Sequence, residues 1–491
     1  LIGTDFYNTP LTPLFRGEEM DSPLARGAVG VSNEERYRIN PFDWDNEFPE
    51  IMKNGGFDVV IGNPPYFNIS SLEQSIFDYL SRKYSAIHTG YNDIMYYFIY
   101  QGIELLKENG TLSMITSNYY LGNTYARPLR KYLKKHVSKI INFKDYRIFN
   151  KVNIHTNIII AYKNPKSNAM HLFEKNDKQP LNLTDLESNL NYFTFSRKNL
   201  SEDWVIAENK NFILIEKIRD GNHLLGDLMV ILKGATSGNR QIFTVSHKYA
   251  EENNLEKELL KHSINSADIR RYYLKNSGKY LIYIDENIDI KNHPNIYKYL
   301  LMHKGELSER NEAKKGLYPW YRLERPREKS VYESQEKIVV PYRSDNNRFA
   351  YDDQQGFNDG GGSYALIMKN NTLHLKYILG IINSKLINWY YGFIGKPKGK
   401  SREYFNEPMA KIPIRAIDFF DITDKARHDR MVALVDQMLE LHKQLASART
   451  DHDKTVIQRQ IDATDQQIDQ LVYELYGLTE EEIKIVEEGS P

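Results

Sequence analysis

Between residues 57 and 163, stretches with a strand-like pattern of hydrophobic residues alternate with stretches that have a helix-like pattern. Strand-like apolar runs occur at 57–62, 111–121, 139–146 and 153–163. Between them, at 92–110 and 125–137, apolar residues recur every three to four positions, as in amphipathic helices. Gly110 follows the first helical run and is interpreted as its stop. Alternating strands and helices predict an α/β domain with a doubly wound sheet, in which 57–62 is a buried strand.

The pattern changes after residue 165. Residues 166–215 are polar and weakly periodic, so we predict a connection there. Residues 216–415 combine short strand-like runs, glycine turns and one long apolar helix at 375–394, which predicts an α+β domain. In 416–491, two runs with apolar residues spaced three and four apart, joined by 448–454, predict a helical hairpin.

The run at 57–62 ends abruptly at Asn63-Pro64-Pro65-Tyr66. Two prolines cannot continue a strand ladder, because each lacks an amide donor and fixes its own φ. Asn63 and Tyr66 are therefore expected on a stiff turn at the carboxyl end of a strand, where open α/β sheets place their ligand sites.

This turn suits chemistry on the amino group of a nucleobase. Such a nitrogen is a poor nucleophile, because its lone pair is delocalised into the ring. If the Asn63 side-chain oxygen and the Pro64 carbonyl each accept one amine hydrogen, the lone pair is aimed at an incoming electrophile without a general base. Tyr66 can stack on the ring. A base in duplex DNA would have to be flipped out to reach the turn.

Charge distribution supports a polyanionic partner. The net charge is zero, but residues 416–491 hold 17 acids and 8 bases, so the first 415 residues carry a net charge of +9. Two basic stretches stand out, 127–147 and 385–405, and cations alternate with aromatic residues in the second. This interleaving is typical of nucleic-acid binding. A solvated helix face explains the first stretch equally well.

The residue types and patterns that the sequence lacks exclude several further classes of protein and site. Cysteine is absent, which excludes disulfides and cysteine nucleophiles and fits the reducing cytoplasm, where we expect this protein. No apolar run approaches the roughly 20 residues that span a bilayer. No histidine pair has the spacing of a metal site, so we expect no metal.

The stretch FDWDNEFPEIMKNGGFDVVIGNPPY, residues 42–66, resembles the gamma-class adenine-specific DNA methyltransferases of type II, type IIG-like restriction–modification systems. The resemblance implies a partial Rossmann-like methyltransferase domain over 1–165. It also implies transfer of a methyl group from S-adenosylmethionine to adenine N6. Asn63, Pro64, Pro65 and Tyr66 then form the catalytic motif, and Phe149 is a second aromatic residue against the flipped base. Without the resemblance, Phe149 is interpreted as a core residue.

Six blocks between residues 232 and 414, among them YPWYRLERPR and KGKSREYFNEPMAKIPI, are similar to the TaqI-like specificity domain of these enzymes. The resemblance implies a target recognition domain over 216–415 that contacts double-stranded DNA. The DNA-binding candidates are Trp320, Arg322, Arg325, Lys396, Lys398, Lys400 and Arg402. For Trp320, Arg322 and Arg325, a surface turn is an equal alternative. The lysines suit phosphate contacts.

The glycine-rich S-adenosylmethionine loop of the family is not found ahead of Asn63. We therefore expect an N-terminally truncated fragment whose main cofactor loop lies upstream of residue 1, and we assign no cofactor residue. An endonuclease domain in the intact protein is left open. Two alternatives remain: a methyltransferase acting on RNA or on a protein amide, and a DNA-binding specificity subunit without its own activity.

Overall fold

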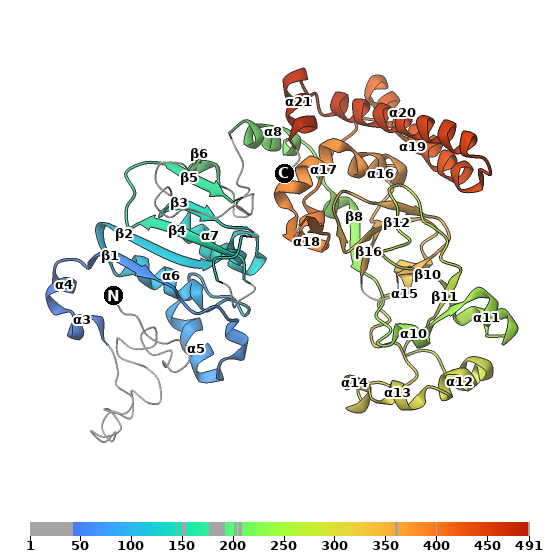
Figure 1. Ribbon diagram of the computed structural model, residues 1–491, viewed down its shortest axis with the longest axis horizontal. Coiled ribbons are helices and arrows are strands. Elements are labelled where there is room, and N and C mark those ends of the chain that lie inside the picture. The colour runs from blue at the N-terminus through green and yellow to red at the C-terminus, as the bar shows by residue number, and fades with distance from the viewer. Residues whose placement is uncertain are drawn as a thin grey trace. The chain divides into compact units, whose positions relative to one another are not determined.

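The computed structural model describes residues 43–144, 146–149, 154–175, 192–200, 204, 209–358, 362–398 and 400–489. The chain divides into two compact units, 1–212 and 213–491 (Figure 1). The glycines ahead of position 42 (Gly3, Gly17, Gly27 and Gly30) lie outside the described residues.

A mixed six-stranded sheet forms the centre of the first unit, in the order β1-β2-β4-β3-β5-β6. Its strands are β1 (Phe57–Gly62), β2 (Leu106–Ser117), β3 (Val137–Asn142), β4 (Thr156–Tyr162), β5 (Ala169–Glu174) and β6 (Phe193–Ser196). The α-helices described in this unit are α3 (Trp44–Glu47), α4 (Pro49–Lys53), α5 (Gln74–Lys83), α6 (Met95–Glu104) and α7 (Arg127–Leu133). β1 pairs with β2, and β3 with β5, in parallel. The other neighbouring pairs are antiparallel.

The core of this unit lies between the sheet and its helices. Leu112 on β2, Ile159 on β4 and Ile99 on α6 belong to one buried apolar cluster. A Cβ at Gly102 of α6 would lie 2.6 Å from a methyl carbon of Leu112, so this glycine allows the helix to approach β2 closely. The helices and strands predicted around β2 and β4 therefore pack as one layered α/β unit.

Several boundaries differ from those predicted; for example, the strand predicted at 111–121 ends at Ser117, and residues Asn118–Leu121 form a 3₁₀ helix. α6 ends at Glu104, and Gly110 lies inside β2 rather than after a helix, because Asn109 (φ 63°) makes an irregular turn within the strand. β5 and β6 extend the sheet into the interval 166–215, where the sequence predicted only a connection. Their short, polar-flanked runs carry too little periodicity to be recognised.

β1 is the end strand in the order of the described sheet, and it is not buried as predicted. Val59 and Ile61 are 53% and 78% exposed. An apolar run predicts that a strand is covered by other parts of the protein, but it does not identify the segment that covers it.

Several small sheets form the second unit. Two are four-stranded, β15-β10-β11-β9 and β14-β12-β16-β8; the others are β13-β18-β17 and β19-β7. The strands are β7 (His223–Leu224), β8 (Met229–Lys233), β9 (Thr244–Ser246), β10 (Leu260–Ile264), β11 (Lys279–Ile282), β12 (Lys337–Pro341), β13 (Arg343–Ser344), β14 (Ala350–Asp352), β15 (Phe357–Asn358), β16 (Ser363–Met368), β17 (Lys396–Lys398), β18 (Ser401–Glu403) and β19 (Pro413–Ile414).

The shorter helices of this unit lie between and around the strands. They are α9 (Leu225–Leu228), α10 (Arg240–Phe243), α11 (His247–Glu252), α12 (Pro294–Leu301), α13 (Lys304–Ser308), α14 (Asn311–Lys314), α15 (Lys329–Glu333) and α18 (Asn406–Ala410). α8 (Asn209–Arg219) crosses the division between the units. The long apolar helix predicted at 375–394 is two helices, α16 (Leu375–Asn383) and α17 (Lys385–Ile394). Ser384 separates them and caps the second, its hydroxyl accepting from the Ile387 amide.

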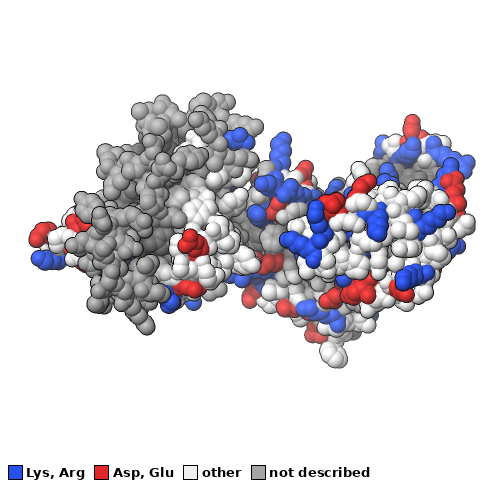
Figure 2. All heavy atoms as spheres, turned by 90° about the horizontal axis from the view of Figure 1, so that it is seen from below, with Lys and Arg blue, Asp and Glu red and all other residues white. Residues whose placement is uncertain are grey.

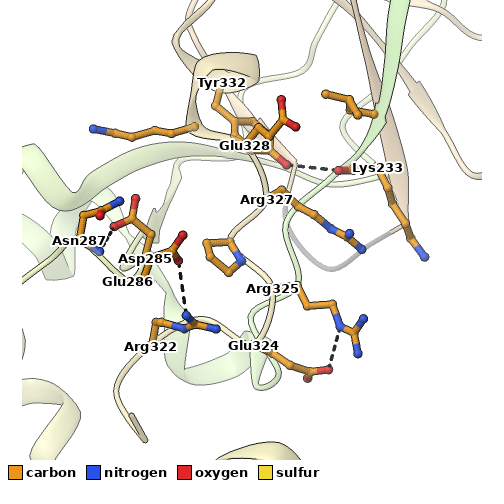
Figure 3. Close-up of a pocket in the computed structure, with 13 residues that line it drawn as sticks. Lys233, Asp285, Glu286, Asn287, Arg322, Glu324, Arg325, Arg327, Glu328 and Tyr332 are labelled. Carbon is orange, nitrogen blue, oxygen red and sulfur yellow. Dashed lines mark hydrogen bonds and ion pairs between the residues drawn. The ribbon is translucent and has the colours of Figure 1, made fainter. Parts of the chain in front are cut away.

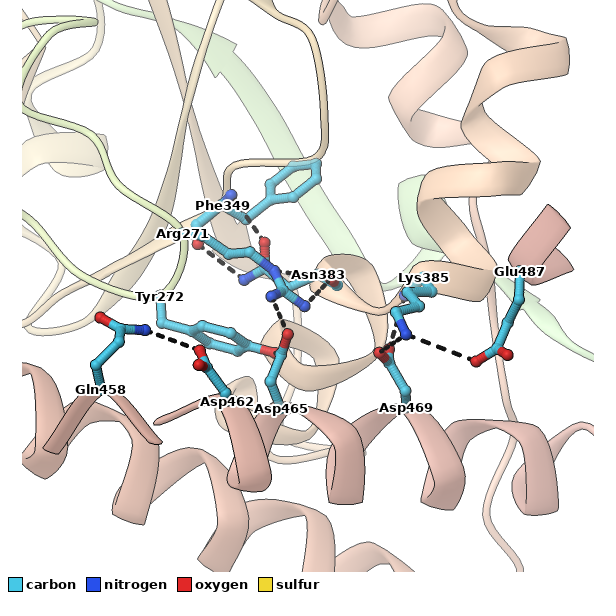
Figure 4. A network of polar contacts seen from close by, with 10 residues as sticks. All are labelled: Arg271, Tyr272, Phe349, Asn383, Lys385, Gln458, Asp462, Asp465, Asp469 and Glu487. Carbon is cyan, nitrogen blue, oxygen red and sulfur yellow. Dashed lines mark hydrogen bonds and ion pairs between the residues drawn. The ribbon is translucent and has the colours of Figure 1, made fainter. Parts of the chain in front are cut away.

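The chain ends in two long helices that pack against each other, α19 (Ile422–Ser447) and α20 (Asp451–Leu475), followed by α21 (Glu480–Glu488). The joint is shorter than predicted, because Asp451 already opens α20. Figure 4 shows how α20 is held: Arg271 pairs with Asp465 and donates from Nη2 to the Asn383 carbonyl at 2.7 Å, and the Lys385 amide donates to Asp469 at 2.8 Å. The hairpin is therefore part of the second unit.

Within the described part of the chain, no helix combines the length and apolar character needed to cross a membrane.

Candidate active site and DNA-recognition surface

The Asn63-Pro64-Pro65-Tyr66 turn follows β1 directly. The Tyr66 hydroxyl lies 2.6 Å from Asn63 Oδ1 and 2.9 Å from the Ile115 carbonyl oxygen of β2. Pro64 is buried, whereas Asn63 is exposed. The turn is thus anchored to the neighbouring strand through Tyr66, while the amide of Asn63 faces outward at the carboxyl end of the sheet.

The segment 93–95 hydrogen-bonds to Phe67, which directly follows the turn. The Ile94 amide donates to the Phe67 carbonyl at 2.9 Å, and Asp93 Oδ1 accepts from the Met95 amide at 3.0 Å. Burial raises the pKa of Asp93 to about 6, against hydrogen bonds from the Met95 and Phe67 amides that lower it. Burial, and then the charge of Asp93, raise the pKa of the Tyr66 hydroxyl, which therefore remains protonated at neutral pH.

This geometry leaves acceptor capacity at Asn63. An amide oxygen has two lone pairs, so Oδ1 can accept from the Tyr66 hydroxyl and from one further donor. Tyr66 thereby fixes the orientation of the Asn63 side chain. The turn can accept hydrogens from a ligand amine at Asn63 Oδ1, and its proline backbone resists displacement.

A pocket of about 720 Å³ lies in the second unit, and Figure 3 shows side chains from separate segments converging on it. Arg322 and Arg325 line it together with Lys233, Asp285 and Glu286. The sequence placed the two arginines on one loop but did not predict the concave surface around them.

Arg310 positions this loop. Its Nη1 donates to the Ser237 carbonyl at 2.7 Å, and its Nη2 donates to the carbonyls of Trp320 and Arg322 at 2.5 and 2.9 Å. Gly238, with φ +78°, lies against the Arg310 side chain, where a Cβ would approach it to 2.9 Å. One guanidinium therefore fixes the backbone on both sides of the arginine loop.

Two family models match the chain. Residues 15–149 match the Eco57I restriction-modification methylase model, and residues 261–414 match the TaqI-like C-terminal specificity domain model. The chain joins an Eco57I-like methylase segment to a TaqI-like specificity domain. These matches confirm the resemblance to restriction–modification methylases and to TaqI-like specificity domains.

Named relatives are similar over most of this chain. The type II restriction enzyme and methyltransferase RM.Eco57I of Escherichia coli is 26% identical over 93% of this chain, which spans 49% of that protein. The type II methyltransferase M.HincII of Haemophilus influenzae is 26% identical, with 84% of this chain and 85% of that protein covered. The chain thus spans about half of the first relative.

Among solved structures, the type IIL restriction-modification enzyme MmeI in complex with DNA is similar in fold. The TM-score is 0.58 at 12% identity, over 91% of this chain and 58% of that chain.

In the methylase segment, Asn63 and Tyr66 lie together as predicted. Phe149 is half-buried, and residues 150–153 after it lie outside the described residues, so its role at the base remains a prediction. The sequence did not single out Asp93, which is half-buried and accepts from the Met95 amide. The only signal in the sequence was an acid immediately before an apolar helix.

In the specificity domain, the predicted DNA contacts separate into four groups. Arg322 and Arg325 line the pocket, whereas Trp320 packs against the core cluster under Lys304 Nζ, 5.7 Å from its ring. Lys396, Lys398 and Lys400 are exposed on the hairpin of β17 and β18.

Arg402 does not belong to this lysine row. It is 8% exposed and donates to the Asn388 carbonyl at 3.0 Å, and its β18 neighbour Glu403 is buried as well. Lys396 pairs at 3.2 Å with Glu403. Burial alone would raise the pKa of Glu403, but hydrogen bonds and charge from Lys396, together with Arg343, lower it. On the face drawn in Figure 2, Lys and Arg side chains of the second unit gather in clusters with acidic side chains between them.

Among the residues that the structure describes, no group of three or more His, Asp or Glu side chains is placed to hold a metal ion.

Proposed function

We propose that this protein is a site-specific DNA methyltransferase of a restriction–modification system, and that it methylates N6 of an adenine flipped out of duplex DNA. The observation that carries the proposal is the Asn63–Tyr66 turn, with its outward amide held by a hydroxyl 2.6 Å away at the carboxyl end of β1. The named relatives RM.Eco57I and M.HincII, both type II methyltransferases, support DNA methylation.

The turn activates the target amine by accepting its hydrogens. The adenine amino group donates one hydrogen to Asn63 Oδ1 and the other to the Pro64 carbonyl, which draws the nitrogen towards tetrahedral geometry. The lone pair would then be aimed at the methyl carbon of the sulfonium donor. Transfer would form the nitrogen–carbon bond, break the carbon–sulfur bond and leave a neutral thioether, and the proton of the methylated nitrogen would pass to solvent. Tyr66 contributes its ring face to the base and its hydroxyl to the orientation of Asn63.

S-adenosylmethionine supplies the methyl group from a sulfonium cation. The turn fits an approaching cation, because Asn63 Oδ1 is an acceptor and the carboxylate of Asp93 lies close enough to Tyr66 to raise its pKa. We assign no described residue to cofactor binding.

The second unit selects the site on double-stranded DNA. The exposed lysines of the β17–β18 hairpin would hold phosphates, and the arginine pocket would face base edges. The MmeI enzyme, similar in fold, was solved in complex with DNA.

Methylation mapping tests this proposal. N6-methyladenine is mapped by long-read sequencing in cells that express the complete gene encoding this chain, or the same gene with Asn63→Ala. Asn54→Ala, at an exposed asparagine of the same unit, is the matched control. We expect one methylated sequence motif in the wild type and control, and none with Asn63→Ala. Methylation that persists without Asn63 would refute the activation argument, and no motif in any sample would refute the DNA substrate.

A further inference from the structure

The pocket of the second unit has a mixed charge that does not suit a phosphate. Five Lys or Arg and four Asp or Glu side chains line it, so its net charge is only +1. A phosphate site would not hold four carboxylates, because each repels the anion. A base-pair edge, in contrast, presents acceptors and donors side by side.

Arg322 has the geometry of a base-reading arginine. Its side chain is 20% exposed, and its guanidinium lies over the Tyr318 ring, 5.0 Å from the centroid. Its Nε is buried and has no hydrogen-bond partner among the described residues. Arg310 holds the Arg322 carbonyl at 2.9 Å, so the backbone that carries the side chain is fixed. A preorganised planar fork of this kind favours bidentate recognition.

Glu286 faces Arg322 across the pocket, where Figure 3 shows the two joined by a dashed line. The Arg322 Nη1 to Glu286 Oε2 distance is 3.4 Å, and the Glu286 side chain is 64% exposed. A long, solvated ion pair is worth little, so both groups can exchange it for another partner.

The donors of Arg322 and the carboxylate acceptor of Glu286 complement the major-groove edge of one base pair. In the major groove guanine presents two acceptors, O6 and N7, and its partner cytosine presents the N4 amine as a donor. We propose that Arg322 and Glu286 together read one G·C pair of the recognition sequence, Arg322 donating to guanine O6 and N7 and Glu286 accepting from cytosine N4. This inference rests on the proposed function, because it assumes that the second unit meets duplex DNA.

Selection from a random duplex library tests the assignment. The wild-type chain is compared with Arg322→Lys, which keeps the charge but loses the fork, and with Glu286→Gln, which keeps size and exposure. Lys248→Ala, on the exposed face of α11, is the control. We expect each of the two pocket variants to lower the preference for G·C at one and the same motif position by about 10-fold. Every other position, and the control, should match the wild type.

The outcomes separate this inference from the proposed function. If the wild type selects a motif and both pocket variants select it unchanged, the pocket does not read the pair, although the proposed function stands. If Arg322→Lys weakens all sequences alike, Arg322 is a phosphate contact and the inference is wrong. If the wild type selects no motif, both proposals fail. Glu286→Gln guards against a folding defect, because its side chain is mostly in solvent.

Discussion

Asp93 in the first unit and Asp352 in the second are held by different partners. In the first unit, half-buried Asp93 lies close to the Asn63–Tyr66 turn, where the Met95 amide donates to it and partial burial raises its pKa to about 6. In the second unit, Asp352 forms a 2.6 Å ion pair with Lys337, and both side chains are 0% exposed. Asp93 thus accepts from a backbone amide, whereas Asp352 accepts from the Gln354 and Gly356 amides and in addition pairs with a lysine.

This difference extends to the proposed sites. Asn63 and Tyr66 are three residues apart, and prolines fix the backbone between them. The pocket of the second unit instead gathers Glu286 and Arg322 from separate segments, and Arg310 must hold the loop. A local site is encoded in a short stretch of sequence, whereas an assembled site depends on the whole unit around it.

Removing one buried charge should have the largest effect. Lys337→Met leaves Asp352 buried without its cation, which should lower the free energy of unfolding of the second unit by about 3–5 kcal/mol. Hydrogen exchange measured by mass spectrometry reports each unit separately. We expect loss of protection in peptides from 213–491 and none in peptides from the first sheet.

The double replacement Lys337→Met with Asp352→Leu is the matched control, because it removes both charges and leaves apolar groups. It should recover most of the lost stability. Equal stability of the single variant and the wild type would show that the ion pair does not maintain the second unit, and the contrast between Asp352 and Asp93 would then be incorrect.

Much of the fold could be predicted because local patterns dominate it. The strands β1 to β4 and the paired terminal helices follow from apolar periodicity. β5 and β6 were missed, since their pairing with β3 and with each other, not their own pattern, makes them strands. The break at Ser384 was also missed, although a serine followed by a good helix former is a capping signal.

The site residues also differ in whether local sequence could predict them. The turn at Asn63 could be predicted because prolines and a strand end leave few conformations. Asp93 and Arg310 could not, since their importance comes from burial and from carbonyls distant in sequence. Arg402 was placed among exposed lysines, because nothing in the local sequence shows that its guanidinium reaches the carbonyl of Asn388.

Two substitutions at Tyr66 sharpen the description of the turn. Tyr66→Ala removes both ring and hydroxyl and should lower kcat/KM about 10- to 100-fold, from a stacking contact of about 1–3 kcal/mol. Tyr66→Phe keeps the ring but not the 2.6 Å contact to Asn63, and should lower kcat by about 3- to 10-fold with little change in KM. Steady-state kinetics on methylatable duplex DNA distinguish them. Full activity of Tyr66→Phe would show that the hydroxyl does not orient Asn63.

Asp93 should make the stability of the first unit depend on pH. Because burial raises its folded pKa to about 6, the folded state favours the protonated form. The contribution of Asp93 to the free energy of unfolding of this unit is therefore highest below about pH 4, where Asp93 is protonated in both states. It falls as the pH rises through 6 and the folded unit must hold an ionised Asp93. Asp93→Asn, always neutral, should therefore stabilise the unit by about 1–2 kcal/mol at pH 8 but not at pH 4. Urea unfolding at both values is the measurement, with exposed Asp78→Asn as control. A pH-independent difference would contradict the assigned pKa.

We expect the smallest effects from substitutions in the β17–β18 hairpin. These substitutions should distinguish its exposed lysines from Arg402. Lys396→Ala, Lys398→Ala and Lys400→Ala should each weaken binding to all DNA sequences alike by a few-fold and reduce the salt slope by about 1, because each removes one phosphate contact. Arg402→Ala should leave the slope unchanged and lower stability instead, since its guanidinium is buried on the Asn388 carbonyl. Fluorescence anisotropy across a salt series measures the slopes. An unchanged slope for the lysines would place the phosphates elsewhere on the second unit, whereas a changed motif would make the lysines base readers like Arg322.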